Sequence, residues 1–431
     1  MEHGRNKFLK LNGGGAVASY VSDKPEGLDQ MGDGGSDGRN PSLYLALCRR
    51  RDWSACETSS PLYKVAVDLP DPNSGDDSDS NDDSSSPGPP PPVRLHRRCD
   101  LDTDMAGKAF VYLPKPGWIL GVGGNNPGGA IIFDTKSSKV IRAPEFVSRK
   151  WNPVVAVVGD RVYALTRSPD YVQEPDFPPW FEVLDLSNPV VTETEEGVLY
   201  LQDSCSWKDL PHPVFFPHLL TPRDFRNPPY ITVRSSVVIG HYILVSLNQP
   251  SNCIFAFDTY SGEWHKIAGE YLPFVGAATP HGHGGDIFLA CSQENGPIKA
   301  YRIHVVSNMS RGPSEKKDEC AVKLSITEMT VRNKEHFEVV RSECCISLDR
   351  EHFSVLFCRE GSGRFLVYDK KTEETYPRKL YLRLVTYRTE SPVVEGKTPE
   401  IVISSQREQT FKVCSSFGFS SFAPIAFALY I

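Results

Sequence analysis

His281 and His283, separated by Gly282, form the tightest pair of histidines in the chain. Two imidazoles at this spacing are able to bind one zinc ion, but a protein zinc site needs a third or fourth ligand. No further histidine or cysteine stands beside the pair. We interpret the segment as a polar loop, with metal binding as the alternative, and we predict no metal site.

The segment from Gly121 to Gly129 contains five glycines and resembles a nucleotide-binding loop at first sight. The G-x-G-x-x-G spacing fails, because Asn126 occupies the place of the third glycine. No helical pattern follows, so the helix N-terminus that holds a phosphate group is missing. We predict a loop between two strands and no cofactor.

Nucleophilic and acid–base motifs are also absent from the sequence. There is no G-x-S-x-G elbow and no H-E-x-x-H, and no cysteine has a catalytic context. Asp134, Asp185, Asp258 and Asp369 recur at equivalent places after apolar runs. A repeated aspartate that binds its own turn amides is structural, so we predict no catalytic residue and no enzymatic activity.

An acidic and serine-rich stretch, residues 71–92, is the most unusual part of the sequence and ends in a run of prolines. Ser74 and Ser80 each have an aspartate three residues later, which suits acid-directed kinases. Phosphorylation would add charge and could recruit a basic partner. The alternative is a solvated low-complexity loop with no specific role.

Short runs of β-branched and aromatic residues, bounded by glycine, asparagine, aspartate or proline, fill the rest of the chain. No window has a sustained helical period with caps. The sequence therefore predicts an all-β fold. The clearest runs are 119–122, 130–133, 154–158, 161–165, 236–239, 242–247, 253–257, 287–291, 298–303 and 354–358.

These runs repeat as a unit in which an aromatic or apolar strand ends in a polar residue, turns, and continues to a tryptophan or proline. The anchors at 133, 184, 257, 301 and 368 indicate about six units, which is typical of a β-propeller. We expect residues 1–42 to be disordered, 43–431 to form the propeller, and 71–92 to project from it as a loop. A ring must close, and we expect Phe422–Ile431 to pair with the unit that begins near Leu43.

Two units carry a resemblance to kelch repeats. The first has the apolar strand, Gly123-Gly124 and the aromatic-aspartate turn at Asp134; the second has Asp258 and then Trp264. Together they resemble a large, uncharacterised family of kelch-like and F-box-associated proteins in grasses. The resemblance implies a propeller that binds other proteins. An F-box helical bundle, which many such relatives carry, is not seen in this sequence.

Composition and charge indicate which partners and which cellular compartments suit the protein. The formal net charge is −7 and much of it lies in the acidic insert, which argues against a nucleic-acid-binding body. No apolar run reaches membrane-spanning length, and the N-terminus has no signal-peptide pattern. Eleven cysteines without framework spacing indicate reduced thiols. We expect a monomer in the cytoplasm or nucleus.

The leading functional hypothesis is a non-enzymatic protein-interaction platform, since propellers present variable loops on a rigid ring. Trp180, Phe215 and Phe216 lie beside proline-rich inserts, where exposed aromatics would anchor a partner, although they could equally be buried loop cores. One alternative is a substrate-recognition subunit that acts with a ubiquitin ligase. A second is a carbohydrate-active propeller enzyme, which needs acids or metal ligands that converge at the channel mouth.

Overall fold

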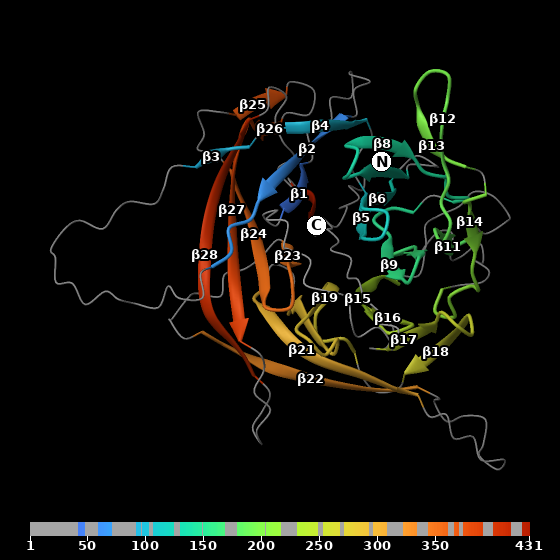
Figure 1. Ribbon diagram of the computed structural model, residues 1–431. Coiled ribbons are helices and arrows are strands. Elements are labelled where there is room, and N and C mark those ends of the chain that lie inside the picture. The colour runs from blue at the N-terminus through green and yellow to red at the C-terminus, as the bar shows by residue number, and fades with distance from the viewer. Residues whose placement is uncertain are drawn as a thin grey trace, which may run out of the picture.

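The computed structural model of the chain consists of strands and turns in the residues that it describes, which confirms the predicted all-β class (Figure 1). Within those residues, no helix has the length and apolar composition needed to span a bilayer. The described residues are 42–47, 59–70, 92–95, 97–102, 107–124, 130–148, 150–168, 179–202, 204–216, 231–248, 253–267, 271–292, 296–307, 322–333, 344–360, 366–369, 374–390, 400–414 and 425–431.

Antiparallel pairing joins most of the described strands in groups of four, and each group forms one blade of a β-propeller. We name each blade by its innermost strand and count its strands outward. The β29 blade consists of β29 (Ile425–Tyr430), β1 (Ser42–Leu47), β2 (Ser59–Ala66) and β4 (Arg97–Asp102), and the β5 blade of β5 (Lys108–Leu113), β6 (Trp118–Gly123), β7 (Ile131–Asp134) and β8 (Lys139–Arg142). The β9 blade consists of β9 (Val154–Val158), β10 (Arg161–Leu165), β11 (Phe181–Asp185) and β14 (Trp207–Asp209), and the β15 blade of β15 (Val233–Ile239), β16 (Tyr242–Leu247), β17 (Ile254–Asp258) and β18 (Glu263–Ile267). The β19 blade consists of β19 (Val275–His281), β20 (Ile287–Cys291), β21 (Ile298–Ser307) and β22 (Val322–Asn333), and the β23 blade of β23 (Cys344–Ser347), β24 (His352–Glu360), β27 (Lys379–Glu390) and β28 (Glu400–Cys414).

The innermost strands contact one another in a closed cycle, in the order β29, β5, β9, β15, β19, β23 and back to β29 (Figure 1). Closure depends on the C-terminal strand, because β29 pairs antiparallel with β1, with Leu43 opposite Tyr430 and Ala46 opposite Phe427. The expected pairing of the C-terminal segment with the N-terminal unit is confirmed. A ring of this kind leaves no blade with an uncovered inner edge.

Neighbouring blades bury each other's faces. The rings of Phe110 in the β5 blade and Phe427 in the β29 blade lie 4.2 Å apart, and those of Phe181 in the β9 blade and Phe257 in the β15 blade lie 4.8 Å apart. Because each inner strand is covered on both faces, strands such as β6 are buried at every residue. This explains why they read as continuous apolar runs and not as alternating patterns.

One backbone hydrogen bond recurs in five blades and fixes the turn between the first and second strands. In each, an N–H within the third strand or directly after it donates to the carbonyl of the residue that precedes the second strand. The repetition shows that these blades share one backbone design. The bonds are Thr135 to Gly117 (3.0 Å), Leu186 to Asp160 (2.9 Å), Thr259 to His241 (3.1 Å), Ile303 to Asp286 (2.8 Å) and Thr389 to Glu351 (2.7 Å).

The repeated aspartates act within their own turns. The Asp134 carboxylate accepts a hydrogen bond from the Lys136 N–H at 3.0 Å and one from the Ser137 hydroxyl at 2.6 Å. The Asp258 carboxylate accepts one from the Tyr260 N–H at 2.9 Å. These are the contacts that a turn-forming aspartate makes.

Tryptophans in two of the fourth strands, β14 and β18, connect their blades to the preceding ones. The indole N–H of Trp207 donates to the carbonyl of Pro144 at 3.1 Å, and that of Trp264 donates to the carbonyl of Pro211 at 3.3 Å. Each proline lies two residues after the fourth strand of the preceding blade. Trp264 also packs 5.3 Å from Phe181, so its place is inter-blade packing, as its repeat position suggests.

Gly123 and Gly124 end the second strand of the β5 blade with φ angles of +100° and +103°, which L-residues rarely adopt. A Cβ on Gly123 would lie 2.6 Å from the carbonyl oxygen of Lys150. The N–H of Gly124 donates to the same oxygen at 3.0 Å. The double glycine therefore permits the close approach of the loop that enters the β9 blade.

The anchor that the sequence analysis placed at Tyr368-Asp369 is wrong. Asp369 ends β25 (Leu366–Asp369), which pairs with β26 (Glu374–Pro377) in a separate two-stranded hairpin between β24 and β27. The third strand of that blade is β27, and Tyr387-Arg388-Thr389 occupies the repeat position. Arginine replaces the aspartate there, which hid the copy from a search for an aromatic-aspartate turn.

Other insertions extend the ring outward. The hairpin of β12 (Val191–Glu193) and β13 (Leu199–Leu201) adds to β8 through a parallel pairing, and β3 (Val93–Arg94) adds to β28 in the same way. Residues 1–41 and 71–91 lie outside the described residues, so the expectations for the N-terminal segment and for most of the acidic insert remain predictions.

Candidate functional site

The aromatics expected to anchor a partner lie inside the fold. Trp180 and Phe216 are each 2% exposed and make an edge contact, with ring centroids 6.1 Å apart. Phe215 is partly buried against Phe255 and Trp264, between the β9 and β15 blades. The expectation of exposed side chains is wrong for Trp180 and Phe216, because the seam between two blades covers them. They form a loop core, which was the alternative.

The two serines proposed as phosphorylation sites, Ser74 and Ser80, lie outside the described residues. Their modification remains a prediction.

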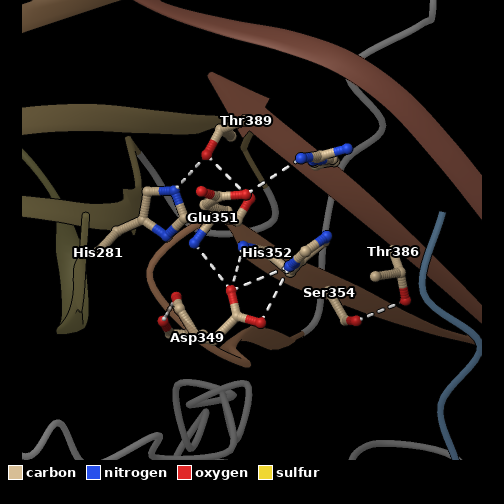
Figure 2. Close-up of polar contacts among 9 residues, drawn as sticks. His281, Asp349, Glu351, His352, Ser354, Thr386 and Thr389 are labelled. Carbon is tan, nitrogen blue, oxygen red and sulfur yellow. Dashed lines mark hydrogen bonds and ion pairs between the residues drawn. The ribbon is translucent and has the colours of Figure 1, made fainter. Parts of the chain in front are cut away.

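The structure instead gathers polar groups at one end of the seam between the β19 and β23 blades (Figure 2). His281 is the last residue of β19 and is 4% exposed. Thr389 lies near the end of β27, and residues 348–351 form the turn between β23 and β24. Strands from two blades therefore position the site.

Thr389 contacts the buried imidazole of His281. The Thr389 hydroxyl lies 2.9 Å from the carbonyl of Glu351 and 2.8 Å from Nε2 of His281. We assign the one hydroxyl proton to the carbonyl, which can only accept, and the hydrogen of the imidazole to Nε2. Nδ1 is then a lone-pair acceptor, and it is buried without a hydrogen-bond partner among the described residues.

Burial lowers the pKa of His281 to about 4, and the nearby Asp349 carboxylate opposes this only in part. The imidazole is therefore neutral at physiological pH. Phe353 presents its ring edge-on to the imidazole at 5.7 Å between centroids, which adds to the apolar surroundings.

Asp349 organises the turn beneath His281 (Figure 2). Its Oδ1 accepts hydrogen bonds from the backbone N–H groups of Glu351 and His352 at 2.8 and 2.7 Å. The Nδ1–H of His352 also donates to this carboxylate, at 2.9 Å. Burial acts to raise the pKa of Asp349, but the bond from His352 and these backbone bonds outweigh it and hold the pKa below its usual value.

A small pocket opens at this place. Its volume is about 10 Å³, which is room for one water-sized group. It is lined by His281, Gly282, His283, Ile287, Arg350, Glu351, Thr389, Glu390 and Ile401. Among the described residues, no group of three or more histidine, cysteine, aspartate or glutamate side chains could hold a metal ion.

A second buried polar cluster lies at the opposite end of the inner strands, where the chain enters β9. Lys150 and Glu182 form an ion pair whose side chains are both 0% exposed. The Lys150 ammonium also donates to Ser148 Oγ at 3.0 Å and to the Pro179 carbonyl at 2.9 Å, and the other oxygen of Glu182 accepts from the Val147 N–H at 3.2 Å. All three ammonium protons have acceptors, and both carboxylate oxygens have donors. We call this fully hydrogen-bonded pair the Lys150–Glu182 clamp.

Sequence reasoning singled out His281 and His283 but missed Asp349, Glu351 and Thr389. These three come from a different blade, and sequence distance conceals their approach. A search for an aromatic residue two positions before a threonine, as in Phe133-Asp134-Thr135 and Tyr387-Arg388-Thr389, would have found Thr389 as a repeat position.

Comparisons with known proteins give a family and two distant structural likenesses. The solved structures that the chain resembles include a proposed 6-phosphogluconolactonase from Bacteroides fragilis, with a TM-score of 0.41, 8% identity, and coverage of 92% of this chain and 100% of that one. A second is a proposed 6-phosphogluconolactonase from Bacteroides uniformis, with a TM-score of 0.39, 9% identity, and coverage of 91% and 99%. No curated protein matches the chain.

A family model matches residues 40–411, which include strands of every blade and end before β29. The description of the matching family names neither kelch repeats nor an F-box. The chain belongs to the family described as Protein of unknown function (DUF1668).

Proposed function

We propose that this propeller is a non-enzymatic protein-binding platform and that partners contact its inner-turn face. We define this face as the turns at 114–117, 159–160, 240–241, 282–286 and 348–351, together with the third-strand ends that bond to them. The observation that carries the proposal is the recurring backbone bond of five blades, because it holds one geometry while the side chains that it presents differ. A constant scaffold with variable side chains is how propellers achieve specific binding.

The side chains on this face differ in charge and type from blade to blade. Arg161 pairs with Asp185 at 3.1 Å in the β9 blade, whereas the polarity is reversed in the β19 blade, where Arg302 of the third strand pairs with Asp286 at 3.1 Å. In the β15 blade His241 takes this place, where it lies 3.7 Å from Asp258 and stacks on an aromatic ring. Such a pattern supports recognition of one particular complementary surface.

That aromatic stack is the most exposed anchor on the face. Tyr260 is 78% exposed and lies parallel to His241, with ring centroids 4.4 Å apart and an interplanar angle of 17°. A tyrosine that is held by stacking loses little further side-chain entropy on binding, which suits an interface anchor. Lys136, in the corresponding turn of the β5 blade, is exposed as well.

Affinity purification with matched variants of the full chain tests the proposal. The face variant combines Lys136→Glu with Tyr260→Ser, and the control variant makes the same two changes on the outer rim, Lys208→Glu with Tyr200→Ser. We expect proteins recovered with the wild-type chain and the control variant to fall at least about tenfold with the face variant, as loss of an anchor residue predicts. Thermal unfolding of both variants verifies that the ring remains intact.

Retention of every partner by the face variant would overturn the proposal, and so would recovery of no partner by the wild-type chain. If the protein lost from the face variant is a ubiquitin-ligase scaffold, the platform acts as a substrate-recognition subunit.

A further inference from the structure

Arg167 lies two residues after β10, at the end of the ring opposite the inner-turn face. Its Nε–H donates to the carbonyl of Asn152, just before β9, at 3.0 Å, and its Nη1 donates to the carbonyl of Val233, the first residue of β15, at 3.2 Å. Because β9 and β15 are neighbouring innermost strands (Figure 1), these bonds fix the guanidinium at the inner end of the seam between two blades.

The charge of this guanidinium has no counter-ion among the described residues. Two of its five N–H groups bind the carbonyls, and the other three have no acceptor in that part of the chain. Arg167 is partly buried, and burial lowers its pKa with no opposing contribution from a carboxylate. The nearest buried acid along the chain entry, Glu182, is already paired with Lys150. The fold therefore leaves a cation partly removed from water and unpaired.

Other hydrogen-bond donors lie at the same junction. The hydroxyls of Ser168 and Thr232 are 2.9 Å apart, so one donates to the other and one hydroxyl proton remains. The Thr232 N–H donates to Oδ1 of Asn248 at 2.7 Å, which assigns the oxygen to that side of the amide. The two N–H groups of the Asn248 amide have no acceptor within the described ranges. Donors thus outnumber acceptors beside Arg167.

A surplus of donors around a cation is the arrangement that an oxyanion needs. The oxygens of a carboxylate or phosphate group accept in parallel from two N–H groups of one guanidinium, and such charge-assisted bonds are about twice as strong as neutral ones. A cationic ligand would be repelled by Arg167 and would meet mostly donors. Water can accept the hydrogen bonds, but it does not neutralise the charge.

We propose that this junction, which we call the Arg167 site, binds an oxyanion of the carboxylate or phosphate class. Arg167 supplies the charge and a pair of parallel N–H donors. The Asn248 amide and the remaining hydroxyl proton of the Ser168–Thr232 pair bind the other oxygens. The site is independent of the proposed function, because it lies at the opposite end of the strands from the inner-turn face.

NMR of the full chain with isotope-labelled arginine tests the site. The probes are sodium phosphate and sodium acetate, each added against sodium chloride at constant pH and ionic strength, and the Arg167 guanidinium signal is identified by its loss in Arg167→Lys. We expect at least one of the two oxyanions to shift this signal in a saturable manner, and chloride to leave it unchanged. The oxyanion that saturates at the lower concentration identifies the class of ligand.

Asn248→Asp tests the donor set without removing Arg167. The aspartate keeps an oxygen for the Thr232 N–H, replaces the amide donors and adds a negative charge beside the cation. Asn188→Asp, an exposed position after the third strand at the other end of the β9 blade, is the matched control. We expect Asn248→Asp to weaken binding of the oxyanion by about tenfold or more and Asn188→Asp to leave it unchanged.

Arg167→Lys gives a second measurement, with the backbone amide signal of Ser168 as the reporter. It keeps the charge but lacks the parallel N–H pair, and we expect the affinity to fall by about tenfold. Thermal unfolding in chloride verifies that each variant is folded. The proposal is wrong if chloride shifts the Arg167 signal as much as both oxyanions do, if no anion shifts it, or if folded Asn248→Asp and Arg167→Lys bind as tightly as the wild-type chain.

Discussion

Two buried polar clusters lie at opposite ends of the propeller's inner strands, and they differ in how completely their hydrogen bonds are satisfied. The Lys150–Glu182 clamp has an acceptor for each ammonium proton and a donor for each carboxylate oxygen. At the His281 site one ring nitrogen is bound to Thr389, and the other has no hydrogen-bond partner in the part of the chain that the structure describes. Most buried polar groups that stabilise a fold have all their hydrogen bonds satisfied. A buried polar group without a partner therefore needs its own explanation.

Energetics also distinguish the clusters. The desolvation of two full charges lowers the pKa of Lys150 and raises that of Glu182, and their mutual attraction opposes both shifts. The clamp gives little net stability relative to an apolar pair of the same shape, but loss of one partner leaves an isolated charge. The His281 site avoids that cost because its histidine is neutral.

The largest expected effect comes from breaking the clamp. Lys150→Met leaves the Glu182 carboxylate buried without its counter-ion, and we expect the free energy of unfolding to fall by about 3–5 kcal/mol. The double variant with Glu182→Leu removes both charges and should recover most of that loss. Chemical denaturation of the two variants measures the difference. If the single variant is as stable as the double variant, the unpaired Glu182 carboxylate does not destabilise the fold, and the prediction is wrong.

The next effect is a pH dependence that belongs to the His281 site. The unfolded imidazole binds a proton below its ordinary pKa of 6.5, whereas the folded one stays neutral to about pH 4. The unfolded state thus holds more protons in this window, so stability is full above pH 6.5 and falls by about 3 kcal/mol as the pH drops to 4.

Denaturation curves of the wild-type chain and His281→Gln across this window isolate the contribution, since other titrating groups are common to both. The clamp variants should retain the wild-type slope. Parallel pH profiles for the wild-type chain and His281→Gln would contradict the assignment.

The smallest effect concerns the threonine that bonds to the preceding turn. Thr389→Val removes the hydroxyl that accepts from His281 and donates to Glu351, and we expect a loss of about 2 kcal/mol because a buried N–H becomes unsatisfied. Thr135→Val is the matched control. Its hydroxyl donates to the Gly117 carbonyl at 2.7 Å without a buried histidine, and we expect a loss of about 1 kcal/mol. If thermal or chemical unfolding shows equal losses of stability in the two variants, the bond between His281 and Thr389 adds nothing to the free energy of unfolding.

The all-β class, the repeated unit and the closing role of the C-terminal strand could be predicted from the sequence alone. These features depend on local patterns, because apolar runs bounded by turn residues form strands, and a ring of repeats needs its two ends to meet. Asp134, Asp258 and Gly123 were recognisable for the same reason, since each acts within a few residues of its own position.

Which side chains are buried, and which of them come together, depends on how the blades pack. Trp180 and Phe216 stand beside proline-rich inserts, yet the seam between two blades covers them. His281 meets Thr389 across 108 positions of sequence. Such contacts depend on how one blade sits against the next, and that relation is set by the packing of whole faces, which no single run of residues encodes.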